Sequence, residues 1–252
     1  MAVKKVTSIF AKENFNMLLV LALIVCAFAI GYLFNKVQSL EKGGSSNTNI
    51  AAGNANNQPS NPSVPTPPQA GDVDPVSDSD HVRGNRNATI ALIEYSDYEC
   101  PYCKSFHPTA QQALDEFGEN LMWVYRHFPL DQLHPKARPS AIASECVAKL
   151  GGNDAFWKFT DTLFNATSWT IADLPNFATQ AGVDKAAFES CQKDSSIADI
   201  VQNQYESGIS AGVSGTPGNI LLNTKTGEKR LIPGAVPFAS LQSAIGQMLS
   251  EG

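Results

Sequence analysis

Two cysteines separated by two residues carry the clearest chemical signal in this sequence. The segment Cys100-Pro101-Tyr102-Cys103 follows an apolar run over residues 90–95 and precedes a helical pattern over residues 104–117. The free N–H groups and the positive dipole end of a helix N-terminus stabilise a thiolate, and the thiolate is the form that attacks disulfides. Pro101 suits the first helical turn, where its missing N–H would have had no partner. The spacing therefore predicts dithiol–disulfide chemistry.

A pair of cysteines at this spacing also occurs in metal sites. A closed zinc site needs four ligands, and the sequence has no second C-x-x-C and no C-x-x-H. The pair could instead bind copper or another soft metal and pass it on, which would make the protein a non-enzymatic assembly module. No Met-rich or His-rich cluster accompanies the pair. We therefore favour redox chemistry and expect no metal and no cofactor.

The charge balance restricts the possible partners. The chain has 252 residues and a net charge of −6. Residues 14–252 alone carry 15 basic and 23 acidic side chains. This acidic balance argues against nucleic acid as a partner.

An uncharged stretch near the N-terminus predicts a membrane anchor. The 22 residues 14–35 carry no charge, and as a helix they would measure about 33 Å, against about 30 Å for a bilayer core. Lys4, Lys5 and Lys12 precede the stretch. The positive-inside rule then places residues 1–13 in the cytoplasm as a short tail and the remaining chain outside. We expect a single-pass protein of the cell membrane with an extracytoplasmic domain.

Two other interpretations of this stretch remain open. Ala27-Phe28-Ala29 resembles a cleavage site, which would make the stretch a signal peptide. A lipoprotein signal ending at Cys26 is a second alternative, although Val25 is bulky for that pattern. The apolar run continues to Phe34, and this length favours an uncleaved anchor.

Residues 36–80 are predicted to form a disordered linker. Between Gly43 and Ala70 there is no charge, and Asn, Ser, Gly and Pro dominate. Such a composition cannot bury enough apolar surface to offset the entropy lost on ordering. The segment could hold a domain away from the membrane, or it could contain a binding motif.

The rest of the chain alternates between strand and helix patterns. Strands are expected at 90–95, 121–127, 220–223 and 228–232, the last two joined by a turn at 225–227. Helices are expected at 104–117, 141–150, 154–164, 173–181, 184–191, 196–211 and 238–249. Five of these helices form a block at about 136–212.

Glu94 interrupts the apolar run six residues before Cys100. Burial would raise its pKa, because desolvation disfavours the charged carboxylate. Such an acid can accept and return the proton of the second cysteine. The alternative is a glutamate at a strand edge that faces water. We interpret His107 as a surface histidine, and we expect His127 and His134 to have structural or solvent roles.

The order of these elements resembles the DsbA-like thiol–disulfide oxidoreductases, and most closely their membrane-anchored bacterial branch. The similarity covers about residues 80–252. Its motifs are residues 94–103, which include the Cys-Pro-Tyr-Cys segment, Val213-Ser214-Gly215-Thr216-Pro217, and Pro233-Gly234-Ala235. The resemblance implies an α/β, thioredoxin-like fold over residues 81–252 with an inserted helical subdomain at about 136–212.

The resemblance also implies roles for single residues. Cys100 would be the attacking, more exposed cysteine and Cys103 the resolving one. Pro217 would be cis and packed beside the dithiol, with Thr216 before it, and Glu94 would be the buried acid of the family. The sequence departs from many relatives at Gly218-Asn219, where they carry bulkier and more apolar residues.

Two further cysteines, Cys146 and Cys191, lie in the helical block. In an oxidising compartment they can form a structural disulfide, and relatives in this branch often have such a second pair. The alternative is two separate buried thiols.

The direction of the reaction stays open at this stage. By resemblance, the enzyme would oxidise reduced secreted or envelope proteins, and a quinone-linked membrane partner would reoxidise it. The Pro-Tyr pair lacks the histidine of the strongest oxidants, and Asp97 and Glu99 should disfavour an additional negative charge nearby. A reductase or isomerase is therefore an alternative, although the absence of a recognisable dimerisation domain weakens the isomerase interpretation.

Overall fold

The computed structural model describes residues 69–251. The expected tail at 1–13, the expected anchor at 14–35 and the linker up to residue 68 lie outside the described residues. Within 69–251, no helix combines the length and the apolar character needed to cross a membrane.

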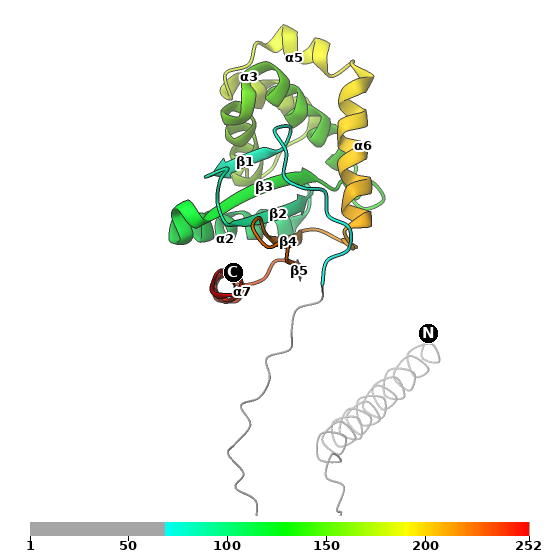
Figure 1. The fold of residues 1–252 in the computed structure, drawn as a ribbon. Coiled ribbons are helices and arrows are strands. Elements are labelled where there is room, and N and C mark those ends of the chain that lie inside the picture. Colours follow the sequence, from blue (N-terminus) through cyan, green and yellow to red (C-terminus); the bar gives the residue numbers. More distant parts are fainter. Residues whose placement is uncertain (1–68, 252) are drawn as a thin grey trace, which may run out of the picture. The chain divides into compact units, whose positions relative to one another are not determined.

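A five-stranded mixed sheet forms the centre of the domain, in the order β1-β3-β2-β4-β5 (Figure 1). Strands β2 and β3 are parallel, and the other neighbouring pairs are antiparallel. The strands are β1 (His81–Gly84), β2 (Ile90–Ser96), β3 (Leu121–His127), β4 (Gly218–Asn223) and β5 (Lys229–Pro233). The expected hairpin is thus present as β4 and β5.

Helices surround this sheet, and Figure 1 shows α3 and α5 gathered beyond β1, with α6 running back from α5. They are α2 (Pro101–Phe117), α3 (Ala137–Asn165), α4 (Leu174–Gln180), α5 (Lys185–Cys191), α6 (Ser195–Ser210) and α7 (Phe238–Ser250), with short 3-10 turns η1 (Gly118–Asn120) and η2 (Ile171–Asp173). The two helices expected at 141–150 and 154–164 join in α3, which kinks at Gly152, where φ is 75°. A positive φ is readily adopted by glycine.

The central strand β2 is buried along its whole length. Its alternate residues enter two apolar cores on opposite faces of the sheet, as the period of two in a strand requires. Leu92 belongs to the core that contains α2 and α7 side chains. Ile93 and Tyr95 belong to the core on the other face. On that face α6 packs closely against Phe128, and the absence of a side chain at Gly208 permits this approach. A Cβ at this position would lie only 2.6 Å from the Phe128 ring.

Strand β1 and the segment before it were not expected from the sequence. Residues 69–80, assigned above to the disordered linker 36–80, pack on the domain instead. Val73 is buried in the same core as Ile93 and Tyr95. Asp80 accepts two hydrogen bonds from Arg126 of β3, at 2.8 and 3.0 Å. The guanidinium also donates to the carbonyl groups of Asp74 and Pro75. The linker assignment is therefore wrong for this segment, because a buried ion pair compensates for its polar composition.

Candidate active site

The two cysteines of the Cys-Pro-Tyr-Cys segment lie at the start of α2. Cys100 is the N-cap residue in extended conformation, and Pro101 opens the helix. The amide of Lys104 donates to the carbonyl of Cys100 at 3.1 Å, which closes the first turn. The helix therefore begins three residues earlier than the pattern at 104–117 suggested, and both cysteines lie at its N-terminus.

The environment of Cys100 favours its thiolate. A hydrogen bond from Cys103 is the largest influence, and together with Thr216 and the amides of Tyr102 and Cys103 it lowers the pKa of Cys100 to about 5, against the opposing effect of burial. The thiol donates to the carbonyl oxygen of Thr216 at 3.4 Å. The peptide bond between Thr216 and Pro217 is cis. The structure therefore brings Thr216 next to Cys100, although they are 116 positions apart.

Cys103 has the opposite character. It is fully buried, whereas Cys100 is 3% exposed. Burial, the interaction with Cys100 and the negative charge of Glu94 raise the pKa of Cys103 well above its ordinary value. One cysteine is thus stabilised as the anion and the other as the neutral thiol.

Glu94 lies on β2, in the layer that faces α2. It is fully buried, and burial raises its pKa, although the nearby Ser96 hydroxyl, the charge of His107 and the hydrogen bond from Trp123 oppose this effect. The indole N–H of Trp123 donates to Glu94 Oε2 at 2.9 Å. Glu94 Oε1 has no hydrogen-bond partner among the described residues. The glutamate therefore does not face water, and its charge acts on Cys103.

Asn219, one of the two unusual residues after Pro217, lies directly opposite Glu94 in the pairing of β2 with β4. Its amide donates to the carbonyl of Gly234 at 3.0 Å, and this bond ties β4 to the loop after β5. A Cβ on Gly218 would lie 2.4 Å from Val213. The small residue at 218 therefore lets the Val213 loop approach β4.

Asp97 and Glu99 are both engaged by donors from the loop before α3. Asp97 accepts from the amide of Leu130 at 3.0 Å and lies 2.8 Å from His134 Nδ1. Glu99 accepts from the amide of Lys136 at 2.6 Å and faces its ammonium group at 3.3 Å. The pKa of Cys100 is lowered although both carboxylates lie nearby, and their opposing effect on the thiolate stays a prediction. These partners could not be predicted from the sequence, because the loop has no periodic pattern.

His107 is buried and not at the surface, so that interpretation was wrong. Its Nε2 lies 2.8 Å from Asp161 Oδ1, and its ring packs against Trp123 with 4.9 Å between ring centres. Asp161 belongs to α3 and also accepts from Arg83 at 2.7 Å. The face of α2 that carries His107 therefore packs against α3, which the sequence of α2 alone could not show.

Cys146 of α3 and Cys191 of α5 are joined by a disulfide. The bond joins cysteines that are 45 residues apart in the sequence, and it lies in the core that also contains the α2 and α7 side chains. It is the pairing that the resemblance implied, and it leaves Cys100 and Cys103 as the free cysteines of the described part of the chain.

A buried cluster of His81, His127 and Glu145 could offer three ligand atoms to a metal ion, all within 4.8 Å of one another. Both imidazoles instead contact the same carboxylate oxygen, at 2.9 and 3.1 Å. Burial opposes ionisation of Glu145, but hydrogen bonds from His127 and His81 lower its pKa to about 2. The cluster thus satisfies its own polar groups, and it gives His127 the structural role expected for it.

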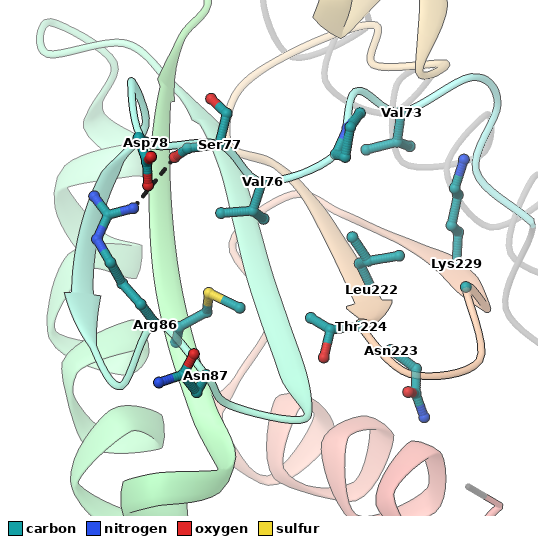
Figure 2. Close-up of a pocket in the computed structure, with 13 residues that line it drawn as sticks. Val73, Val76, Ser77, Asp78, Arg86, Asn87, Leu222, Asn223, Thr224 and Lys229 are labelled. Carbon is teal, nitrogen blue, oxygen red and sulfur yellow. Dashed lines mark hydrogen bonds between the residues drawn. The ribbon is translucent and has the colours of Figure 1, made fainter.

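Two small cavities flank the dithiol. One, of about 280 Å³, is lined by Cys100 and by residues of α2 and α3. The other, of about 200 Å³, is lined by residues 212–218 and the end of β5. A larger cavity of about 1080 Å³ lies elsewhere, between the segment before β1 and the end of β4 (Figure 2). It contains none of the expected site residues, so size does not identify the active site here.

Comparisons with known proteins agree with this geometry. The family model described as Thioredoxin matches residues 76–237. DsbA2 of Pseudomonas aeruginosa is 28% identical with a TM-score of 0.60, over 69% of this chain and 97% of that protein. Alpha-DsbA1 of Wolbachia pipientis, 22% identical with a TM-score of 0.60 over 70% of this chain and 94% of that one, shares the fold.

The curated relatives are longer proteins. Na(+)/H(+) antiporter NhaA 1 of Mycolicibacterium gilvum is 38% identical over 120 residues, which are 46% of this chain and 18% of that protein. NhaA 1 of Salinispora arenicola is 36% identical over 146 residues, 58% of this chain and 22% of that protein. The chain therefore spans about a fifth of the length of these relatives.

The chain belongs to the thioredoxin family, and it is similar to the DsbA-like thiol–disulfide oxidoreductases. The resemblance and the thioredoxin-like α/β fold expected from the sequence are confirmed at this level.

Proposed function

We propose that the domain oxidises thiols of secreted or envelope proteins to disulfides outside the cytoplasm. The observation that carries this proposal is the opposite tuning of the two cysteines, with the pKa of Cys100 lowered to about 5 and that of Cys103 raised. An anion that is stabilised in the dithiol form favours reduction of the enzyme, and therefore oxidation of the substrate.

The cycle begins with Cys100 and Cys103 joined as a disulfide. A substrate thiolate attacks Cys100 Sγ, which breaks the Cys100–Cys103 bond and forms a mixed disulfide. The sulfur of Cys103 leaves with the electron pair and takes a proton, because its buried site disfavours the anion. Glu94, whose pKa is raised by burial, is the proposed donor of that proton.

The second step releases the product. Another substrate thiolate attacks the substrate sulfur of the mixed disulfide, and Cys100 departs as a thiolate. Thiols of low pKa are good leaving groups in this exchange. Two electrons pass from the substrate to the enzyme, and a quinone-linked membrane partner, proposed by family analogy, would accept them.

We also propose that residues 14–35 anchor the protein in the cell membrane and that residues 1–13 remain in the cytoplasm. The uncharged stretch and the preceding lysines support this topology. The Cys146–Cys191 disulfide is consistent with an oxidising compartment. When cells that keep an intact cell membrane but have lost their outer layers are treated with protease, the domain should be degraded. Full protection of the domain from the protease would contradict this topology.

The enzymatic proposal is tested with the oxidised full chain and a reduced, unfolded secreted protein. We expect one substrate disulfide to form for each enzyme molecule reduced. Cys103→Ala, first converted to its Cys100–glutathione mixed disulfide, should exchange with a substrate thiolate, release glutathione and accumulate as a mixed disulfide between Cys100 and the substrate. If the protein instead reduces substrate disulfides and does not form them, the alternative of a reductase or isomerase is correct. Tight copper binding that requires both cysteines, without exchange, would support a metal-binding assembly module. The matched region is only about a fifth of each antiporter, so we do not propose ion transport for this chain.

A further inference from the structure

The cavity of about 280 Å³ that Cys100 lines differs in charge from the rest of the domain. We call it the lysine cleft, and the residues used here are Cys100, Lys104, Lys136, Leu163 and Trp169. Residues 14–252 are acidic, with 15 basic and 23 acidic side chains. Two ammonium groups and one carboxylate, that of Glu99, line the cleft. Its net positive charge beside the reactive sulfur is therefore a local exception.

The walls of the lysine cleft are built by two helices and the loop that follows α3. Leu163 is buried and supplies an apolar surface. Trp169 forms a wall, and Lys136 Nζ lies 4.3 Å from the centre of its ring. Lys104 Nζ donates to the carbonyl of Ala166 at 2.5 Å, which holds this side chain across the cleft.

The charges of the two lysines are not equally compensated. Lys136 faces Glu99 at 3.3 Å. Among the described residues, no carboxylate lies within ion-pair distance of Lys104, whose partner is the neutral carbonyl of Ala166. The lysine cleft therefore keeps one positive charge without a counter-charge, close to the sulfur that forms the mixed disulfide.

We propose that the lysine cleft is a substrate subsite that binds an acidic side chain, Asp or Glu, within about three residues of the substrate cysteine. This inference rests on the proposed thiol–disulfide exchange. A carboxylate on the substrate would supply the counter-charge that Lys104 lacks. Its backbone would continue from Cys100 toward Thr216, whose carbonyl accepts from Cys100 at 3.4 Å. Recognition would then come from the lysine cleft and not from the dithiol itself.

The test compares reduced peptides that differ only in the residue two positions from their cysteine, Glu in one and Lys in the other. The quantity measured is the ratio of the two kcat/KM values for oxidation by the full chain. We expect Lys104→Met to lower this Glu-to-Lys ratio about three- to fivefold at low salt, which is the effect of one partly exposed ion pair. Lys104→Arg should preserve the ratio, and added salt should weaken the preference.

Lys185→Met is the matched control, because it removes the same charge from an exposed side chain on α5 that faces Glu189 at 4.0 Å. We expect it to leave the ratio within about twofold of the wild-type value. Equal ratios for wild type, Lys104→Met and Lys185→Met would overturn the subsite, and so would an equal loss in both variants. Thiol–disulfide exchange between the wild-type chain and glutathione serves as the separate readout. If this exchange occurs but the Glu-to-Lys ratio does not respond to Lys104→Met, only the lysine cleft is refuted. If the exchange does not occur, the proposed function fails as well.

Discussion

The hydrogen bond from Cys103 to Cys100 gives the most specific prediction. It is the largest of the influences that lower the pKa of Cys100 to about 5, from an ordinary value of 9.0. Cys103→Ala removes the donor, whereas Cys103→Ser keeps a hydroxyl that can donate. The two variants have nearly the same volume, so the comparison isolates the hydrogen bond.

The size of the effect follows from the titration of one thiol. With a pKa of about 5, roughly 99% of Cys100 is thiolate at pH 7, against roughly 1% with a pKa of 9. We expect Cys103→Ala to raise the pKa of Cys100 by at least about one unit relative to Cys103→Ser. Below the midpoint, each unit reduces the thiolate fraction about tenfold.

The assay is the rate of alkylation of Cys100 between about pH 4 and pH 9, because only the thiolate reacts. The rate should rise through a midpoint near pH 5 to 6 in Cys103→Ser and at a clearly higher pH in Cys103→Ala. Coincident midpoints in the two variants would refute the role of the hydrogen bond. A midpoint near pH 9 in both would refute the stabilised thiolate.

Other predictions concern stability. The raised pKa of Glu94 means that its contribution to folding is present below about pH 4.5 and is lost as the pH rises through the folded pKa. The free energy of unfolding of Glu94→Gln, measured by denaturant titration, should therefore rise by about 1–3 kcal/mol relative to that of the wild type between pH 4 and pH 7. A difference in unfolding free energy that is the same at both pH values would contradict the burial of Glu94. Replacing Cys146 and Cys191 by serine opens a loop of 45 residues and should cost about 2–4 kcal/mol in the same assay; a loss below about 0.5 kcal/mol would argue against the disulfide. Asp80→Asn breaks a buried ion pair with Arg126 and should lower the free energy of unfolding by about 3–5 kcal/mol. The exposed control Asp72→Asn should change it by no more than about 0.5 kcal/mol. Equal effects of the two variants would show that this ion pair does not hold the segment before β1.

The sequence was most informative where structure is decided locally. Cys100, Pro101 and Cys103 could be placed at a helix start because the apolar run, the proline and the helical period lie within about 30 residues of one another. Glu94 could be expected to lie inside, since it interrupts a buried strand. The helix expected at 184–191 is present as α5, and its first expected residue, Asp184, is the N-cap and accepts from the amide of Ala187 at 2.9 Å.

The sequence was least informative where distant residues decide the structure. The segment before β1 has a linker composition, and its order depends on Arg126, which is 46 residues from Asp80. The burial of His107 depends on Asp161, 54 residues away on α3. His134 follows no periodic pattern, and its contact with Asp97 could not be anticipated. In each case a polar residue is compensated by a partner that only the tertiary fold brings close.

The reduction potential of the Cys100–Cys103 pair tests the central claim most directly. It can be measured on the full chain in glutathione buffers, with thiol trapping to separate the oxidised and reduced forms. A stabilised thiolate predicts a value near −120 mV, as for the strong oxidant DsbA. A value near −270 mV, as for thioredoxin, would contradict the oxidase assignment and make the protein a reductase.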